Sequence, residues 1–496
     1  MKKSIEGMLE TLDPYTSFIS EENMEDYKAV TSGQYGGVGI TIRDMDQVIT
    51  VLDVARRSPA DKAGMKTGDM LMRVDDQWLT GKTDSEVFDM LKGVPHTKVK
   101  IAYLQALTKS EITCELVREM IPIPNVPYYG MLDHASKTGY IRLSNFSAEA
   151  GKEVKNALLD LKNRYQIQSL VLDLRNNPGG LLVEAVEIVN LFVKRGQEVV
   201  STRGRVKQWD NIYATRHDPV DTTVALVVMV NRASASASEI VAGAIQDMDR
   251  GVIVGQRTFG KGLVQTTRPL SYNTQAKITT AKYYIPSGRC IQALDYSHRE
   301  EDGSVGHIPD SLIREYKTLK TKRIVRDGGG VSPDIEALPE TMSRIAVTLY
   351  VRNLIFDYAT LYAGQHDSIA PAGDFELTDR EYDEYVAYLQ DKFFDYQTET
   401  EFTFLKLKQL AEKEKYIEDA SAEFDALYAK LSHDRLKDLE IHRKDVKNLL
   451  SEEIAARYYY NAGKIANSIQ KDTQIKVALE VLGEEGKYHA ILHPVE

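Results

Sequence analysis

The sequence predicts a multidomain α/β protein that ends in a mostly helical domain. Three observations support this prediction. The chain has 496 residues, which is enough for three or four domains. Between residues 118 and 340, apolar runs of strand length alternate with stretches of helical spacing, as in α/β domains. From residue 341 to 496, apolar residues recur every three or four positions among many charges, which is typical of amphipathic helices.

Composition and charge narrow the possible functions. A net charge of −11 argues against a general nucleic-acid-binding protein. Cys114 and Cys290 lie far apart, so neither a disulfide framework nor a cysteine metal site is indicated. The sequence has no HExxH motif and its ten histidines do not cluster with cysteine, so we predict no metal and no other cofactor. No run of 18 apolar residues is present, so we predict no membrane span.

The stretch from residue 224 to 265 carries the clearest chemical pattern. Seven apolar residues, 224–230, predict a buried parallel strand. Alternating alanines and serines follow at 233–238 and lead into a segment with helical spacing. A serine at a helix N-terminus lies beside free backbone N–H groups and the positive end of the helix dipole, which favour developing negative charge. The pattern therefore indicates a serine nucleophile.

Lys261 is the candidate base for this serine. A serine hydroxyl is a weak nucleophile until a neighbouring group takes its proton, and lysine can do so only if burial lowers the pKa of its amine. Gly260 and Gly262 flank Lys261 and allow close backbone approach. Gln265 follows four residues later, on the same face in either a helix or a strand, so its amide oxygen is a candidate to orient the amine.

Other interpretations fit the same residues. A run of small residues before a helix is also typical of a helix cap with tight packing. Gly255, Gly260 and Lys261 resemble a phosphate-binding loop, but Gly262 stands where that motif needs a serine or threonine, and no helix pattern follows. A histidine such as His217 is an alternative base in a conventional triad, and spacing alone does not exclude it.

The segment resembles the signature of the carboxyl-terminal processing peptidases, the tail-specific serine proteases. That family has SASAS-E-I-x-A-G-A followed by T-F-G-K-G-x-x-Q, with the nucleophile 25 residues before the lysine. The resemblance assigns the nucleophile to Ser236, the base to Lys261 and the lysine-orienting residue to Gln265. It also implies an oxyanion hole formed by the Ala237 N–H and the N–H of one of two glycines. These glycines are Gly179 and Gly180.

The remainder of residues 118–340 predicts the frame of this site. Strands are expected at 139–143 and 169–174, and helices at 148–165 and 182–192. A Pro-Gly-Gly turn after the second strand occupies the position of active-site loops in open α/β sheets. The sequence does not decide between its two glycines, and Asp173 and Arg175 are expected to form a structural ion pair. Residues from about 296 to 325 are rich in charge, and glycines interrupt any regular pattern, which predicts a surface insertion. The resemblance implies a crotonase/ClpP-like protease core.

Residues 31–117 resemble a PDZ domain. A glycine-rich loop runs into a predicted strand, and its glycines allow successive N–H groups to converge on an anion. The strand is suited to pairing with an extended peptide, and residues 85–93 predict a helix beside the groove. The resemblance implies capture of protein C-termini that end in an apolar side chain. The expected peptide-binding residues are Gly36, Gly37, Val38, Gly39 and Ile40.

The two ends of the chain carry weaker signals. Residues 1–30 predict a helical segment, and an LDPYT sequence within it resembles the LDPYS segment of the family. Residues 341–496 are not covered by the resemblance, and we expect a structural role and a possible homo-oligomer through this domain. The first three residues resemble the start of a signal peptide, but no apolar region follows, so we expect a trimmed form of the protein. Family resemblance implies a periplasmic or cell-envelope location.

Taken with the resemblance, these residues indicate a serine endopeptidase with a Ser/Lys dyad. It would recognise protein C-termini through a PDZ domain and cleave or degrade the tail by way of an acyl-enzyme. The alternative is a catalytically inert PDZ scaffold protein. The presence of Ser236, Lys261 and Gln265 together argues against that alternative. A phosphate-loop nucleotide enzyme is the remaining alternative.

Overall fold

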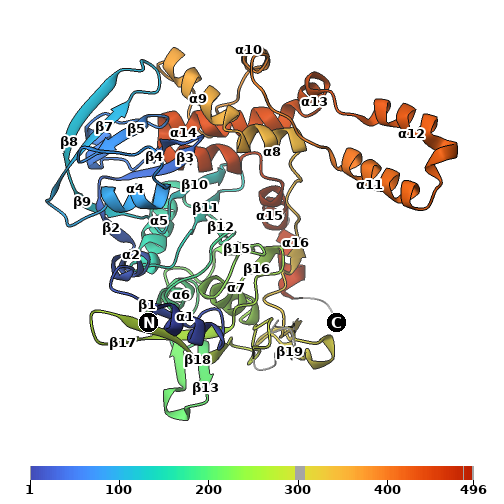
Figure 1. Ribbon diagram of the computed structural model, residues 1–496. Coiled ribbons are helices and arrows are strands. Elements are labelled where there is room, and N and C mark those ends of the chain that lie inside the picture. Colours follow the sequence, from blue (N-terminus) through green and yellow to red (C-terminus); the bar gives the residue numbers. More distant parts are fainter. Residues whose placement is uncertain (1, 297–305, 307, 484, 494–496) are drawn as a thin grey trace. The chain divides into compact units, whose positions relative to one another are not determined.

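The computed structural model of the chain describes residues 2–296, 306, 308–483 and 485–493 (Figure 1). The chain divides into two compact units. Unit 1 comprises Met1–Tyr35, Met120–Pro339 and Asp472–Glu496, and unit 2 comprises Gly36–Glu119 and Glu340–Lys471. The strands β2 (Gln34–Gly37) and β9 (Glu119–Pro122) form a separate two-stranded sheet. The predicted fold class, a multidomain α/β protein with a helical C-terminal domain, is confirmed.

Unit 1 is built around a six-stranded sheet in the order β10-β11-β12-β15-β16-β21. β10 is antiparallel to β11, and all other neighbours are parallel. Residues 226–230 are all buried, as expected for a strand inside a parallel sheet. The strands are β10 (Tyr128–Asp133), β11 (Thr138–Arg142), β12 (Ser169–Asp173), β15 (Ala225–Val230), β16 (Val252–Gly255) and β21 (Ile335–Glu336).

Three helices connect these strands and pack into one apolar core. They are α5 (Ala150–Tyr165), α6 (Leu182–Asn190) and α7 (Ala237–Asp247). Every residue of α7 is buried, which explains its small side chains. Gly243 is needed there because a Cβ at this position would lie 2.6 Å from a side-chain carbon of Ile285. The serine cluster predicted to precede a helix therefore lies at the N-terminus of a helix that neighbouring elements enclose.

A second, antiparallel sheet of unit 1 brings the lysine segment to this helix. Its strands β17 and β18 form a hairpin, and β18 also pairs with β1 and β13. The strands are β1 (Ser17–Ile19), β13 (Glu198–Gly204), β14 (Asn211–Ala214), β17 (Leu263–Pro269) and β18 (Gln275–Tyr284). The other described elements of unit 1 before residue 340 are α1 (Lys2–Glu10), α2 (Met24–Ser32), η1 (Lys207–Trp209), η2 (Asp310–Leu312), β19 (Glu315–Lys317) and β20 (Ile324–Arg326). Part of the predicted surface insertion, residues 297–305 and 307, lies outside the described residues.

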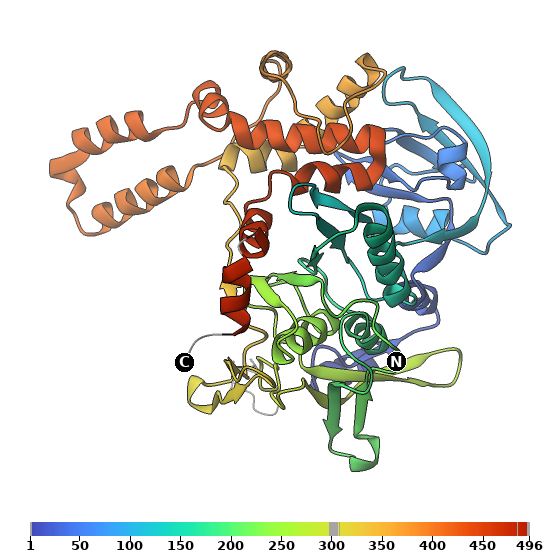
Figure 2. The ribbon, with the colours of Figure 1, turned by 180° about the vertical axis from the view of Figure 1, so that it is seen from behind.

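The last helices of the chain belong to unit 1. Helices α15 (Thr473–Gly483) and α16 (Glu485–Leu492) run beside β15 and β16, as Figure 2 shows from behind. The hydroxyl of Tyr488 accepts a hydrogen bond from the N–H of Leu226 at 3.0 Å. The side chain of Gln474 accepts from Arg175 at 2.8 Å and donates to the carbonyl of Ala337 at 2.6 Å. Helices α15 and α16 therefore pack on the sheet, although the sequence groups them with the helical C-terminal region.

Unit 2 combines a small antiparallel sheet with a helical region. The sheet has the order β3-β4-β5-β7-β8, and β6 pairs with β5. Its elements are β3 (Ile40–Met45), β4 (Val48–Val54), α3 (Pro59–Lys62), β5 (Met70–Val74), β6 (Gln77–Trp78), α4 (Asp84–Leu91), β7 (Lys98–Leu104) and β8 (Glu111–Val117). Thr83 and Glu86 form a capping box at the start of α4, the helix expected beside the peptide groove.

The later helices of unit 2 are α8 (Arg344–Val351), α9 (Leu354–Gln365), α10 (Asp379–Tyr388), α11 (Glu399–Lys413), α12 (Ile417–Leu431), α13 (Arg435–Ile441) and α14 (Arg443–Ile469). Buried residues of α8, α9, α10, α13 and α14 form a core that is rich in tyrosine. Helix α14 is kinked at Tyr460, whose φ of +60° lies outside the helical region. Within the described ranges, no helix combines the length and apolar character needed to cross a membrane.

The expected ion pair of Asp173 and Arg175 lies inside unit 1, with an N–O distance of 2.7 Å. Asp173 also accepts from Tyr140 at 2.7 Å and pairs with Arg142 at 3.1 Å. Burial alone raises the pKa of Asp173, but the guanidinium groups of Arg175 and Arg142 hold this pKa below its usual range. The carboxylate is therefore charged and fully paired inside the fold.

We predict that Asp173→Ala destabilises the protein by roughly 3–5 kcal/mol, because it leaves two guanidinium groups without their buried partner. Chemical denaturation of the full chain measures the effect. The matched control is Glu22→Ala, which removes an exposed pair with Lys2 and should cost less than about 1 kcal/mol. Equal effects of the two changes would contradict a structural role for the buried pair.

Candidate active site

Ser236 stands at the turn between β15 and α7 in a strained conformation, with φ of 55° and ψ of −113°. Such backbone angles are costly for a residue other than glycine and are typical of functional turns. The two flanking serines have structural roles. The buried Ser234 hydroxyl donates to the carbonyl of Leu174 at 2.8 Å, and the buried Ser238 hydroxyl donates to the carbonyl of Asn177 at 2.9 Å. Ser236, in contrast, lines a cavity.

The carboxylate of Glu239 joins the serine turn to the lysine loop. One oxygen accepts the N–H groups of Ser236 at 2.9 Å and Lys261 at 2.8 Å. The other accepts the Thr258 hydroxyl at 2.5 Å and the Gly260 N–H at 2.8 Å. Complete burial raises the pKa of Glu239 to about 7, although these four hydrogen bonds favour the ionised form. Glu239 therefore fixes the backbones of both predicted dyad residues.

The amine of Lys261 lies over an aromatic ring from the N-terminal segment, 4.4 Å from the ring centre of Tyr15. Burial lowers the pKa of the Lys261 ammonium, and the neighbouring Lys277 ammonium lowers it further. The carboxylates of Glu239 and Asp13 raise this pKa in part. A lysine whose pKa is lowered in this way has a larger fraction of neutral amine, the form that a general base requires.

Gln265 is held by a chain of hydrogen bonds. Its amide nitrogen donates to the Thr279 hydroxyl at 3.3 Å, and that hydroxyl donates to the carboxylate of Asp13 at 3.0 Å. The same carboxylate accepts the N–H of Thr16 at 2.9 Å. Because its nitrogen is engaged by Thr279, the amide oxygen of Gln265 remains available as an acceptor.

The turn of Gly179 and Gly180 lies directly against the serine. A Cβ on Gly179 would lie 2.8 Å from the Cβ of Ser236 and 2.9 Å from the N of Ala237. The Gly179 N–H donates to the side-chain oxygen of Asn177 at 2.9 Å. Among the described residues, no acceptor is found for the N–H of Gly180 or of Ala237. The hydrogen bonds therefore distinguish two glycines that the sequence left equivalent: the N–H of Gly179 has an acceptor, and that of Gly180 has none among the described residues.

Tyr283 adds a second link between the serine and the lysine. Its fully buried hydroxyl donates to the carbonyl oxygen of Lys261 at 2.6 Å and lies 3.1 Å from that of Ser236. Glu239 and Tyr283 thus hold the backbones of Ser236 and Lys261 through their N–H and C=O groups respectively.

These groups meet at one cavity of about 380 Å³ in unit 1. Ser236, Lys261 and Gln265 all line it, and so does the Gly179–Gly180 turn. Its apolar walls come from α2, α6, α7 and β17. The apolar lining residues are Val30, Phe146, Pro178, Leu181, Leu182, Ile240, Leu263 and Val264. The predicted catalytic residues and the two candidate oxyanion glycines, which lie up to 86 positions apart in the chain, are thus brought together at one cavity.

The alternative sites fit less well. His217 is 72% exposed at its side chain, lies 3.9 Å from Glu187 and lines a different cavity, so it is not placed to act on Ser236. A strand, β17, follows Lys261, whereas a phosphate-binding loop needs a helix N-terminus there. Within the part of the chain that the structure describes, no group of three His, Cys, Asp or Glu side chains is arranged to hold a metal ion.

The expected peptide-binding loop of unit 2 lies between β2 and β3. Val38 and Ile40 point into the core of the small sheet. The carbonyl of Val38 accepts the N–H of Ala60 at 3.0 Å, and the carbonyl of Gly39 accepts the N–H of Ala55 at 2.8 Å. Gly36 packs so closely on the carbonyl oxygen of Gly93 that a Cβ would lie 2.2 Å from it. The loop is therefore fixed by its carbonyl groups.

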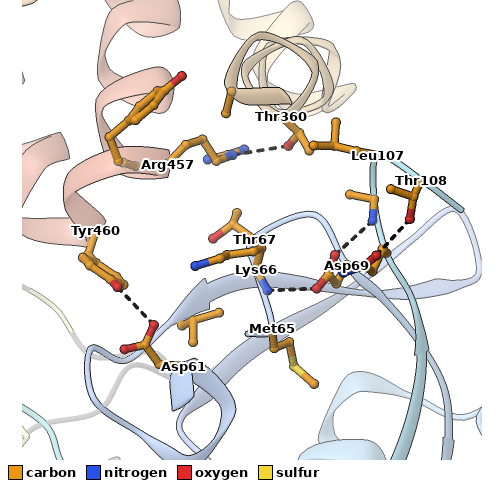
Figure 3. A pocket seen from close by; sticks show the side chains of 16 residues that line it. Asp61, Met65, Lys66, Thr67, Asp69, Leu107, Thr108, Thr360, Arg457 and Tyr460 are labelled. Atoms are coloured by element: carbon orange, nitrogen blue, oxygen red, sulfur yellow. Dashed lines mark hydrogen bonds between the residues drawn. The ribbon is translucent and has the colours of Figure 1, made fainter. Parts of the chain in front are cut away.

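A second cavity of about 380 Å³ lies in unit 2, between the turns of the small sheet and helices α9 and α14 (Figure 3). Three of its charged groups have partners inside the protein. Asp61 accepts from the Tyr460 hydroxyl at 3.0 Å, and Asp69 accepts from the Lys66 N–H at 2.8 Å. Arg457 donates to Thr360 at 3.3 Å. This arrangement is typical of packing between two parts of a unit.

Sequence reasoning did not assign roles to three residues of the active-site region. Glu239 follows Ser236 by three positions, the spacing of a capping box, and that signal was available. Tyr15 and Lys277 reach the site through the pairing of β1, β17 and β18. No local pattern indicates this pairing, so Lys277 had no usable signal, whereas Tyr15 lies in the LDPYT sequence that resembles a family segment.

Comparisons with known proteins identify the domains of the chain. The chain matches peptidase family S41 over residues 137–297, a PDZ domain over 36–116, and the C-terminal helical domain of probable PDZ-proteases over 345–482.

A carboxy-terminal-processing protease of Bartonella bacilliformis is 35% identical over 297 residues, 59% of this chain and 67% of that protein. A probable CtpA-like serine protease of Staphylococcus aureus is 32% identical over 293 residues, 58% of this chain and 57% of that protein. Among solved structures, the photosystem II D1 C-terminal processing protease is 29% identical, with a TM-score of 0.38. The alignment covers 68% of this chain and 81% of that structure.

The raised pKa of Glu239 predicts a pH dependence of stability. Between its ordinary value of 4.5 and about 7, the folded protein keeps a proton that the unfolded chain has lost. The free energy of unfolding should therefore fall across this window, by on the order of 3 kcal/mol from this group. Denaturant unfolding at pH 4, 5.5, 7 and 8 should show the fall in the wild type. Glu239→Gln cannot titrate and should lack this component. Parallel curves for the two proteins would contradict the assignment.

Proposed function

This chain belongs to peptidase family S41, and on that premise we propose that it is a Ser/Lys endopeptidase that cleaves protein tails through an acyl-enzyme. It is a serine-type peptidase related to the carboxy-terminal-processing proteases, and it contains a PDZ domain. The observation that carries the mechanism is the shared cavity: Ser236, Lys261 and Gln265 line it together with the glycine turn.

In the proposed reaction, the hydroxyl of Ser236 attacks the scissile carbonyl while the neutral amine of Lys261 takes its proton. The Lys261 ammonium then protonates the leaving amine, and the acyl group remains on Ser236. A water molecule that loses its proton to Lys261 hydrolyses the ester and releases the serine. The lowered pKa of Lys261 supports this role, because the amine must be neutral at the start of each half-reaction. Gln265 would orient the amine through its free amide oxygen.

The oxyanion of each tetrahedral intermediate would be held by the N–H groups of Gly180 and Ala237. The hydrogen bonding supports Gly180 over Gly179, because the Gly179 N–H already donates to Asn177. The Ala237 N–H belongs to the first residue of α7, where the helix dipole also favours negative charge. Asn177 would act indirectly by fixing the conformation of the turn.

We propose the domain limits 1–30, 31–117, 118–340 and 341–496 for the helical segment, the PDZ domain, the protease core and the helical domain. PDZ domains bind peptide C-termini, so the PDZ domain would capture the substrate tail. Gly36, Gly37, Val38, Gly39 and Ile40 would hold its carboxylate and last residues, with preference for an apolar side chain. We also propose a periplasmic or cell-envelope location, which fractionation of the source cells would test.

Self-association through residues 341–496 is part of the same proposal. The hairpin of α11 and α12 exposes Phe402, Leu407, Leu410 and Leu427, each at least 46% accessible. Exposed apolar side chains gathered on one hairpin are suited to contact with another protein surface. Light scattering at increasing protein concentration tests it, and a constant monomer mass would exclude it. The rival function, an inert PDZ scaffold, is disfavoured because the proposed nucleophile, the base and Gly180 line one cavity.

We predict that Ser236→Ala and Lys261→Ala each abolish cleavage of an unstructured protein with an apolar C-terminus. Ser234→Ala should keep at least a tenth of the wild-type kcat, because the Ser234 hydroxyl bonds to Leu174 and serves only the fold. The kcat/KM of the wild type should rise with pH through the lowered pKa of Lys261, since only the neutral amine is active. Cleavage that survives Lys261→Ala would refute the dyad.

We further predict that an apolar C-terminus promotes cleavage. The same unstructured substrate ending in two valines should have a kcat/KM at least tenfold above that of a version ending in two aspartates, because an apolar PDZ pocket excludes charge. A free peptide with the valine ending should compete with the substrate. Equal kcat/KM values for the two substrates, with no competition, would exclude C-terminal selection by the PDZ domain.

A further inference from the structure

The active-site cavity has an unbalanced charge. Two ammonium groups line it, those of Lys261 and Lys277, and no aspartate or glutamate is among its described lining residues. The nearby carboxylate of Glu239 is completely buried and does not reach the cavity surface. The role proposed for Lys261 is that of the base. Lys277 favours the neutral form of Lys261, but the mechanism gives it no contact with the substrate.

Lys277 lies on β18, directly opposite Thr267 of β17 and Ser17 of β1. Its side chain is half-buried, and within the described ranges no ion pair or hydrogen bond engages its amine. A half-buried cation without a counter-charge is uncommon, because burial removes part of its hydration with no compensating attraction. The Lys277 ammonium lowers the pKa of Lys261, so the two amines interact electrostatically across the cavity.

Two hydroxyl groups line the cavity beside Lys277. The Tyr27 hydroxyl and the Thr267 hydroxyl are 2.7 Å apart and share a hydrogen bond. This bond uses one of their two hydrogens, so the pair retains one hydrogen to donate. Gln265 and Thr267 are two positions apart on β17, and both line the cavity. The wall formed by β17 therefore continues from the proposed base to this group of donors.

An ammonium group with a neighbouring hydroxyl donor is suited to bind a carboxylate. Building on the proposed peptidase function, we propose that Lys277, Thr267 and Tyr27 form a carboxylate-binding subsite beside the scissile bond. The subsite selects substrates that carry a carboxylate within a few residues of that bond. The carboxylate comes either from an aspartate or glutamate side chain or from the free C-terminus of a short leaving segment.

The test uses the full-length protein and a set of internally quenched peptides. In one series with amidated C-termini, a single glutamate or its isostere glutamine is moved through the six positions around the cleaved bond. In a second series without acidic side chains, peptides with a free or an amidated C-terminus end one to four residues after that bond. The readout is the ratio of kcat/KM within each matched pair, in which any change in the pKa of Lys261 cancels.

The wild type should favour the carboxylate-bearing member of at least one pair by about tenfold or more. Lys277→Met should remove the preference, and Lys277→Glu should reverse it toward a peptide with lysine at that position. The matched control is Lys282→Met on the same strand, because Lys282 is exposed and does not line the cavity. It should keep the wild-type ratio. The series that responds identifies the source of the carboxylate. A ratio near one in the wild type, or one unchanged by Lys277→Met, overturns the proposal.

Binding to the Ser236→Ala protein separates this proposal from the peptidase mechanism. Fluorescence anisotropy with the amidated glutamate and glutamine peptides measures the preference without turnover, and amidation removes the C-terminal carboxylate that a PDZ domain would hold. A glutamate preference that Lys277→Met abolishes supports the subsite even if the wild-type protein cleaves nothing, in which case the peptidase mechanism alone fails. Turnover by the wild type, with equal binding of both peptides and no preference for a free C-terminus in the second series, overturns the subsite alone.

Discussion

The active-site region depends on one buried carboxylate. Glu239 receives hydrogen bonds from Ser236, Thr258, Gly260 and Lys261, so a single side chain fixes the serine turn and the lysine loop. The backbone of Ser236 is strained, and strain of this kind persists only where surrounding bonds hold it. The hydrogen bond from the Ser236 N–H to Glu239 is one such bond. The burial that makes this carboxylate effective also raises its pKa to about 7.

Strand β18 provides the second constraint. Tyr283 on this strand bonds to the Lys261 carbonyl next to that of Ser236, and Thr279 bonds to Gln265. Lys277 on the same strand lines the cavity. Antiparallel pairing with β1 and β17 fixes the register, so a slip by one residue would turn these side chains to the opposite face. The N-terminal segment belongs to this arrangement because Tyr15 lies over the amine of Lys261.

Much of this arrangement could be predicted, because the signals are local. The apolar run before the serines, the helical spacing after them and the glycines around Lys261 predicted a strand, a helix and a loop, and the structure contains all three. The choice between Gly179 and Gly180 was out of reach, because it depends on the side-chain orientation of Asn177. Tyr15 and Lys277 were missed because strand pairing, which leaves no local pattern, brings them to the site. The sequences of α15 and α16 have the spacing of ordinary amphipathic helices, and only tertiary contacts reveal that these helices pack on β15 and β16.

The neighbours of Lys261 shift the pKa of its amine in opposite directions. A base must begin neutral, and burial together with the Lys277 ammonium favours the neutral amine. The proton taken from serine must then remain on the amine until the leaving group needs it. The ring of Tyr15 and the carboxylates of Glu239 and Asp13 favour that charged form. An amine that felt only burial and the Lys277 ammonium would accept a proton poorly. An amine that felt only the Tyr15 ring and the two carboxylates would already be protonated. Opposing influences on one amine therefore suit the role proposed for Lys261, that of a base and then an acid within each turnover.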